Sequence, residues 1–356
     1  MPAPQPIWQH LPVHFKEDVV SKLDYNSRCK LRICSKKDKN LVDSRPVILD
    51  YLKYRITEVT FHALEIPQKP AEVTMIDGDE ETNRYLYEND AIDHLLLVFS
   101  NQKLIVNSFV FNVWGHDRTG HQFKLFKKLL TKIKERNLKL KVRNAIISTT
   151  FRHKDQYIEF VKNLDVGSLI SMKLRLSTRC QLTQLSRTEQ WKKVKELEFE
   201  TRDQMDPKWV SHVEKLDAWV KSLNAVAISA MIQVSFYSVF FLKTCLIQNF
   251  ISKQFPRGSY FSITTMSPIN NSRGSTLTNI LKKFPIKAKN DAIKFRTITR
   301  SPIKSHFHSP LHTQKIEMTD QNNVFLIILC ETNFSGIVCG VNSFKDDLKK
   351  FILEIE

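Results

Sequence analysis

The chain has 356 residues, 42% of them hydrophobic and 26% charged, which predicts a globular protein of one or two domains. Its eight glycines include no Gly-x-Gly, so both glycine-rich nucleotide-binding fingerprints are absent despite a formal charge of +17. The six cysteines include no Cys-x-x-Cys pair and the opening segment is polar and proline-rich. We therefore expect a cytoplasmic or nuclear protein rather than a secreted one.

The N-terminal residues 5–50 predict a set of short helices. Phe15, Val19 and Leu23 are spaced i, i+4 and i+8, so they share one face of a helix over residues 15–23. A leucine–proline pair precedes this helix, and proline suits a helix entrance because its missing N–H is not needed there. The first helix is therefore expected to present an apolar face.

Two further helices are predicted in the same segment. The second covers residues 27–34, with Asn26 as its cap. The third begins at Ser35, whose spacing to Asp38 is a capping-box pattern, and it ends before Pro46.

From Arg55 the pattern changes from helix to strand. Residues 56–61 alternate apolar and polar side chains, and 95–99 and 104–113 are rich in branched and aromatic residues, as in a half-buried sheet. A helix–strand unit then repeats, with helices at 123–136, 155–164, 189–194 and 207–223 and strands at 138–147, 169–176, 196–200 and 226–234. We predict an α/β fold in which an N-terminal three-helix unit precedes a short solenoid resembling leucine-rich repeats.

The end of the chain has a different composition. A helix is predicted over 237–250, and residues 257–316 are rich in Ser, Thr, Pro, Asn and Lys without periodicity, so we expect them to be disordered. A hairpin follows at 324–330 and 336–341, then a helix at 345–351. The predicted segments are a helical unit, a repeat domain, a basic loop and a C-terminal strand pair with its helix, at 5–50, 55–255, 256–316 and 317–356.

The N-terminal segment contains two runs of a recognisable kind, Trp8-x-x-Leu11-Pro12 and Arg28-Cys29-x-Leu31-Arg32-x-Cys34-Ser35. With these runs it resembles an F-box, and the nematode F-box family with a C-terminal FTH domain is the nearest resemblance. Two later runs resemble the FTH region: Glu189-Gln190-Trp191-Lys192 and Phe240-Phe241-Leu242-Lys243. The chain departs from the broader F-box pattern in its third helix, which contains no aromatic residue.

The resemblance implies a non-enzymatic adaptor in a ubiquitin ligase. F-box proteins bind a Skp-type adaptor, which in turn binds a cullin, and they select a protein substrate with the rest of the chain. The residues expected to bind the Skp-type adaptor are apolar or small and belong to the first two predicted helices and the leucine–proline pair before them: Leu11, Pro12, Phe15, Val19, Val20, Leu23, Leu31 and Cys34.

Size favours this interpretation of the apolar face. A unit of three short helices is too small to bury its apolar side chains alone, so we expect it to complete its core with a partner. The alternative is that the same face packs against the sheet of its own chain. Trp191, between two predicted strands, is expected to be a core residue.

Other functions can be compared with the sequence in the same way. Basic clusters at 124–143 and 253–315 allow nucleic-acid binding or a general interaction scaffold, although few aromatic residues accompany them. The uncharged run 225–242 is near the lower limit for a membrane span, but it contains polar residues, so we expect no membrane insertion. No zinc-binding or nucleophile motif occurs, so no catalytic residue, metal or cofactor is expected.

Overall fold

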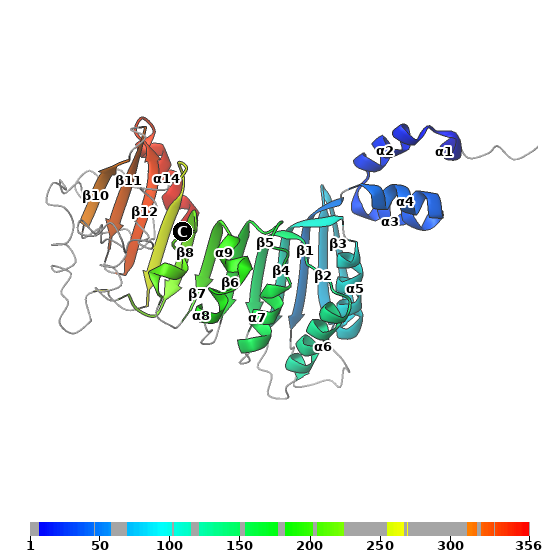
Figure 1. Ribbon diagram of the computed structural model, residues 1–356, viewed down its shortest axis with the longest axis horizontal. Helices are drawn as coiled ribbons and strands as arrows, with labels where there is room; N and C mark the ends of the chain where they lie inside the picture. The colour runs from blue at the N-terminus through cyan, green and yellow to red at the C-terminus, as the bar shows by residue number, and fades with distance from the viewer. Residues whose placement is uncertain are drawn as a thin grey trace, which may run out of the picture. The chain divides into compact units, whose positions relative to one another are not determined.

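The structure is a computed structural model, and its described chain forms two compact units, Met1–Leu169 and Ile170–Glu356 (Figure 1). It describes residues 7–45, 47–57, 70–101, 103–114, 121–149, 154–176, 182–201, 205–223, 255–266, 269, 312–318, 322–330 and 332–355.

The first unit begins with short helices and continues into a mixed sheet. The N-terminal helices are α1 (Ile7–His10), α2 (Val13–Lys22), α3 (Tyr25–Cys34) and α4 (Lys36–Ser44). The strands are β1 (Val47–Thr57), β2 (Pro70–Asp77), β3 (Glu80–Tyr87), β4 (Leu104–Trp114) and β5 (Val142–Thr149). They lie in the order β5-β4-β1-β2-β3, with β1, β4 and β5 parallel and the β1–β2 and β2–β3 pairs antiparallel.

Three further helices supply the apolar core on this sheet: α5 (Glu88–Ser100), α6 (His121–Glu135) and α7 (Lys154–Lys162). Aromatic rings join helices and strands, since Phe111 of β4 stacks on Phe160 of α7 at 4.8 Å between centroids. Phe126 of α6 lies 5.5 Å from the same Phe160 ring, and Phe99 of α5 meets Phe109 edge-on at 5.5 Å. Alternating residues of β4 therefore bury large side chains under the helices.

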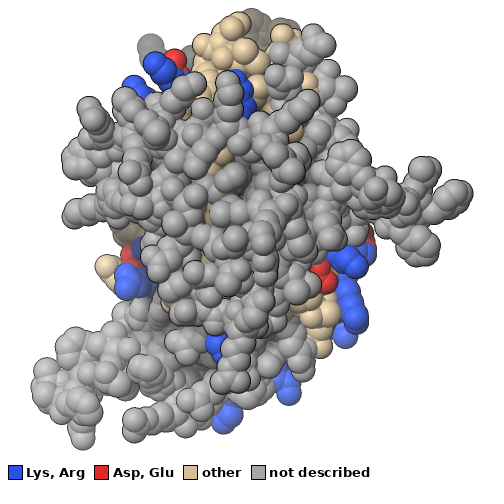
Figure 2. Space-filling model, turned by 90° about the vertical axis from the view of Figure 1, so that its left-hand side faces the viewer, with Lys and Arg blue, Asp and Glu red and all other residues tan. Residues whose placement is uncertain are grey.

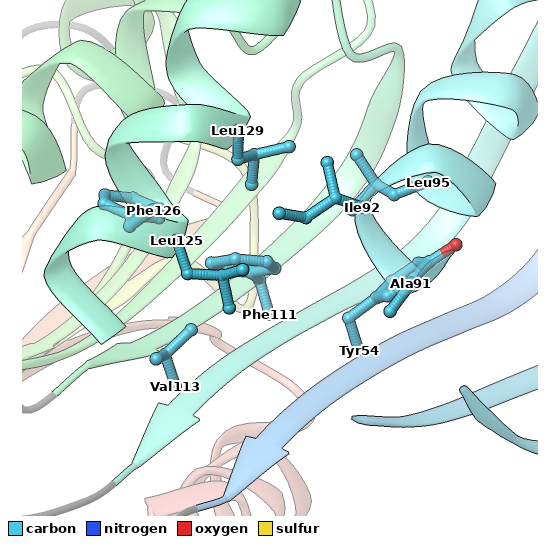
Figure 3. A pocket seen from close by; sticks show the side chains of 9 residues that line it. All are labelled: Tyr54, Ala91, Ile92, Leu95, Phe111, Val113, Leu125, Phe126 and Leu129. Atoms are coloured by element: carbon cyan, nitrogen blue, oxygen red, sulfur yellow. The ribbon is translucent and has the colours of Figure 1, made fainter. Parts of the chain in front are cut away.

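A small pocket lies in this core between α5, α6 and the strands (Figure 3). Its volume is about 10 Å³, room for about one water molecule, so it is a packing defect and not a ligand site. Tyr54 is the polar member of the lining, and its hydroxyl is hydrogen-bonded to His94 Nδ1 at 2.6 Å. The other lining residues are Ala91, Ile92, Leu95, Phe111, Val113, Leu125, Phe126 and Leu129.

The second unit also contains parallel and antiparallel strands. Its strands are β6 (Ser171–Leu176), β7 (Glu196–Glu200), β8 (Lys215–Val220), β9 (Tyr260–Thr265), β10 (His312–Glu317), β11 (Asn323–Leu329) and β12 (Asn333–Gly340). Strands β6 to β9 are parallel neighbours in chain order, and β12, β11 and β10 follow β9 as an antiparallel run. The helical segments are α8 (Leu182–Leu185), α9 (Glu189–Lys193), a 3-10 turn (Pro207–Trp209) and α14 (Phe344–Ile355).

Strands β11 and β12 are buried on both faces, which explains their nearly continuous apolar sequence. On one face Leu348 and Phe351 of α14 pack with the strand residues Val324, Leu326, Ile328, Cys330, Ile337 and Cys339. On the other face Phe261 contacts Phe325 and Phe334, with centroids 6.1 and 5.2 Å away. Gly336 lies under these rings, because a Cβ at this position would overlap Phe261 and Phe325.

Several predicted elements are confirmed. Predicted strands 104–113 and 196–200 are β4 and β7, and the helices at 123–136, 155–164, 189–194 and 345–351 are α6, α7, α9 and α14 within a few residues. The C-terminal hairpin is β11–β12. Trp191 is 1% exposed and its indole N–H donates to the Trp209 carbonyl at 2.6 Å, so it is a core residue as predicted.

Two other predictions are wrong because the spacing of buried residues was assigned to the wrong kind of element. Residues 95–99 belong to helix α5 because their buried members continue the helical spacing of Ala91 and Ile92; these members are Leu95, Leu96, Val98 and Phe99. The predicted helix 207–223 is a 3-10 turn and strand β8, in which alternate residues are buried.

Two further predictions from composition differ from the structure. Within the predicted disordered loop 257–316 lie strand β9 and all but the last residue of β10. Strand β1 begins at Val47, ahead of the predicted 56–61. The hairpin β2–β3 was not predicted. The predicted strand 226–234 and helix 237–250 lie outside the described residues, and the structure does not confirm a leucine-rich-repeat-like solenoid.

Charged side chains form a row across β6, β7 and β8. Lys173, Glu198 and Asp217 are register partners on the three strands, and Lys173 Nζ lies 2.5 Å from Glu198 Oε1. Burial, with the Glu198 carboxylate beside it, raises the pKa of Asp217 to about 7, although Lys173 acts in the opposite direction. The row therefore holds one carboxyl group for which ionisation is costly.

We expect Gly336→Ala to destabilise the chain by about 1–3 kcal/mol, because the added methyl overpacks the aromatic cluster. Chemical denaturation followed by circular dichroism measures this. Gly167→Ala is the matched control, since its Cβ would meet only Asp165 Oδ2 at 3.5 Å, and we expect a change within about 0.5 kcal/mol. Equal stability of the two variants would contradict the close approach at Gly336.

We expect Asp217→Asn to stabilise the chain at pH 8 by about 1–3 kcal/mol. The folded pKa of Asp217 lies above its unfolded value, so the wild type loses stability from this group as the pH rises from about 4 to 7, and the amide does not. Unfolding curves at pH 4 and pH 8 test this, with the exposed Glu200→Gln as control. A pH-independent difference between Asp217→Asn and wild type would show that the carboxyl is not responsible.

Candidate functional site

Side-chain caps begin two of the four N-terminal helices, α3 and α4. Asp24 caps α3 by accepting a hydrogen bond from the Ser27 backbone N–H at 2.7 Å. The predicted cap Asn26 is therefore wrong, because the helix begins before it, at Tyr25. Ser35 caps α4 and accepts from the Asp38 N–H at 3.0 Å, as the capping-box pattern predicts.

A tryptophan from α1 joins this cap. The Trp8 indole N–H donates to Asp38 Oδ1 at 2.8 Å, and the Ser35 hydroxyl donates to Asp38 Oδ2 at 2.6 Å. These two bonds, that from Ser35 first, lower the pKa of Asp38. Lys16 Nζ lies 5.8 Å from the centroid of the Trp8 ring, a cation–π distance. Trp8 thus ties α1 and α2 to the start of α4.

Charged side chains link α2, α3 and α4 to one another. Arg32 of α3 forms a two-pronged pair with Asp43 of α4, at 2.8 and 3.2 Å. Arg45, after α4, lies 2.6 Å from Glu17 of α2. The nearly buried guanidinium of Arg28 donates to backbone carbonyls at the end of α2. Polar links therefore fix the relative positions of α2, α3 and α4.

The apolar core of this helical unit is small. Val20 of α2 and Val42 of α4 are its buried hydrophobic residues, at 0% and 2% exposure, and α2 and α4 contact each other. Large apolar side chains remain at the surface: Val13 is 64% exposed, Phe15 55%, Val19 40% and Ile33 85%. The unit therefore exposes more large apolar side chains than it buries.

The structure divides the predicted partner-binding residues into three groups. Pro12, Phe15, Val19 and Cys34 are exposed, while Leu11, Leu23 and Leu31 are half-buried. Val20 is buried inside the unit. The predicted inward direction of Cys34 is wrong, because its thiol is exposed and lies 3.3 Å from the Lys30 carbonyl.

The sequence reading missed two exposed apolar residues, Val13 and Ile33. Ile33 follows Cys29, also exposed, by one helical turn, so the i, i+4 spacing was a signal for an outward face on α3. Val13 is the first residue of α2, and no periodic signal marks it.

α2 does not cover the sheet of its own unit. The helix that meets the strands is α3, which contacts β1, and the Tyr25 N–H donates to the Asp77 carboxylate on β2. Phe15 and Val19 of α2 stay exposed. The alternative in which the apolar face of α2 packs against the chain's own sheet is therefore wrong for these two side chains.

Among the described residues, no other candidate functional site is as well defined as the surface of the N-terminal helices. They contain no cluster of three or more His, Cys, Asp and Glu side chains suited to a metal ion. No helix among them is long and apolar enough to span a membrane, and the uncharged run 225–242 lies outside them.

The basic residues of the described chain are dispersed. Within cluster 124–143, Lys132 pairs with Asp93 and Lys128 Nζ donates to Asn89 at 2.7 Å. On the face shown in Figure 2, the coloured Lys and Arg side chains are scattered, and several lie beside acidic ones. Most of the second cluster, 253–315, lies outside the described residues.

Comparison with known families identifies the helical unit. The family model of the F-box domain matches residues 8–50, which cover helices α2 to α4, most of α1 and the start of β1. Searches of curated proteins and of solved structures find no match. The chain therefore carries an N-terminal F-box domain followed by strands and helices of mixed α/β type.

We expect Trp8→Phe to raise the pKa of Asp38, because the carboxylate loses a hydrogen-bond donor while the aromatic ring is kept. The folded pKa of Asp38 is depressed, so its contribution to stability is present above the unfolded pKa of about 3.9 and is lost as the pH falls through the folded value. Trp8→Phe should therefore differ from wild type more at pH 7 than at pH 2. An NMR titration of the Asp38 carboxyl measures the shift directly, and an unchanged pKa would contradict the bond.

Proposed function

We propose that this chain is a substrate-recognition adaptor of an SCF-type ubiquitin ligase. In this role the F-box domain binds a Skp-type adaptor, and through it a cullin. The observation that carries the proposal is the exposure of Phe15, Val19 and Ile33 within the matched residues 8–50. Apolar side chains exposed on so small a unit are typical of a surface that is covered by a partner.

The proposed interface with the Skp-type adaptor lies on α2 and α3. Phe15 and Val19, one turn apart on α2, supply its anchors together with Ile33 on α3. The exposed Pro12 and Cys34 lie at the ends of these helices, and the half-buried Leu11, Leu23 and Leu31 support them. Val20 acts from inside the unit, by packing α2 in place.

The rest of the chain is proposed to bind a protein substrate. The segments 55–255, 256–316 and 317–356 form the proposed FTH-like repeat domain, basic loop and C-terminal strand pair. Alternation of α6 with β5, α7 with β6 and α9 with β7 supports a repeat of the leucine-rich kind. In this role the chain is an adaptor and not an enzyme.

We propose a cytoplasmic or nuclear location. The described cysteines Cys29, Cys34, Cys330 and Cys339 are free thiols, which supports a reducing compartment. Nucleic-acid binding is the second candidate function, and the pairing of Lys128 and Lys132 within the described basic cluster weighs against it.

The test uses the full chain, purified and titrated with a Skp-type adaptor. Phe15→Asp and Ile33→Asp should each weaken binding by tenfold or more, about 1.4 kcal/mol, because each places a charge where an apolar side chain is to be buried. Both side chains are exposed in the free chain, so the variants should keep the wild-type circular dichroism spectrum.

Leu97→Asp is the matched control, since Leu97 of α5 is 64% exposed and lies outside the F-box domain. It should bind the adaptor as wild type does. Unchanged affinity in Phe15→Asp and Ile33→Asp, or an equal loss in Leu97→Asp, would defeat the proposed interface.

A further inference from the structure

Strand β3 is an unpartnered edge. It is last in the strand order of the first unit, and no described strand pairs with its outer side (Figure 1). Six of its eight residues are exposed. Tyr85 is 70% exposed and Tyr87 59%. Proteins normally protect such edges with charged side chains, above all lysine, with proline or with a bulge; β3 has no proline or lysine, but it carries Glu80, Glu81 and Arg84.

The hairpin turn determines which backbone groups face outward. Gly78 and Asp79 form a two-residue loop, with Gly78 at φ +60°, so Asp77 and Glu80 form the closing hydrogen-bonded pair. Hydrogen-bonded pairs alternate along an antiparallel ladder, so the backbone groups of Glu81, Asn83, Tyr85 and Tyr87 point away from β2. The position of Pro70 opposite Tyr87 agrees, since proline has no N–H to donate.

Acidic and basic side chains lie at opposite ends of this edge. Asp79, Glu80 and Glu81 occupy the start, whereas Arg84, Tyr85 and Tyr87 occupy the end. A second β3 strand laid antiparallel therefore brings the acidic start of each strand against the arginine and tyrosines of the other. Parallel pairing would place acid against acid. The edge is thus complementary to itself in one direction only.

We propose that β3 is a self-association surface, through which two copies of this chain pair their β3 strands antiparallel about a two-fold axis. The exposed acid–arginine division and the outward backbone groups carry this inference, which goes beyond the adaptor role and is independent of it. A closed two-fold contact of this kind uses the same patch on both copies.

The charges also select the register. With the axis at Asn83, Glu81 lies opposite Tyr85 of the second copy and Glu80 lies diagonal to its Arg84. An axis at Arg84 would set the two arginines opposite each other, which is unfavourable. In the Asn83 register Glu80–Leu86 of one copy pair with Glu80–Leu86 of the other. Asn83 now bonds to Thr74 Oγ1 and to Glu81 Oε1 at 2.7 Å each, side-chain contacts that leave its backbone N–H directed outward.

Sedimentation of the full chain over a concentration series tests the proposal, and a monomer–dimer equilibrium is expected. Asn83→Pro removes an outward N–H, so it should abolish the dimer. Asn83→Ala is its matched control, because it loses the same side-chain bonds and keeps the N–H, and it should still dimerise.

Charge reversal gives a second test of the dimer that does not use a proline substitution. Arg84→Glu should weaken dimerisation about tenfold, because two symmetric contacts are lost, and Glu80→Arg added to it should restore the affinity. A wild type that stays monomeric at all concentrations would overturn the proposal. So would an Asn83→Pro variant that dimerises like Asn83→Ala, or reversed charges without effect. Skp-type adaptor binding should be unchanged in every variant, which separates this result from the test of the adaptor role.

Discussion

The main constraint on this protein is that its N-terminal helices have too little apolar volume to enclose. Val20 and Val42 form the buried part of that unit, while Phe15, Val19 and Ile33 stay in water. Burial of a large apolar side chain stabilises by about 1.5–3 kcal/mol, so covering these three is a substantial driving force for association. Strand β4, in contrast, buries Phe109 and Phe111 against aromatic rings of α5 and α7.

Polar contacts compensate for the small core by fixing the geometry of the helices. The caps at Asp24 and Ser35 start α3 and α4, and the Arg32–Asp43 pair joins these helices. The third predicted helix has no aromatic residue, but Trp8 brings an indole to its N-terminus by bonding to Asp38. An exposed apolar surface on a fixed framework loses little conformational entropy when a partner covers it.

Sequence predicted best those features that depend on local pattern. The F-box helices and the cap at Ser35 follow from spacing and side-chain chemistry. Strand β7 follows from its alternating polar and apolar residues, and the β11–β12 hairpin follows from short apolar runs between turns. It failed where apolar composition is ambiguous: residues 95–99 are as rich in branched and aromatic residues as a strand, yet they complete a helix. Which F-box residues stay exposed depends on tertiary packing, so Val20 could not be separated from Val19 by sequence alone.

Hydrogen exchange of the full chain, with and without a saturating Skp-type adaptor, tests the central claim most directly. If α2 and α3 are completed by a partner, amides of Val13–Lys22 and Tyr25–Cys34 should gain protection in the complex, while those of β11, β12 and α14 exchange as before. Unchanged exchange in both F-box helices at saturating adaptor would contradict the claim that their exposed apolar side chains form the partner surface.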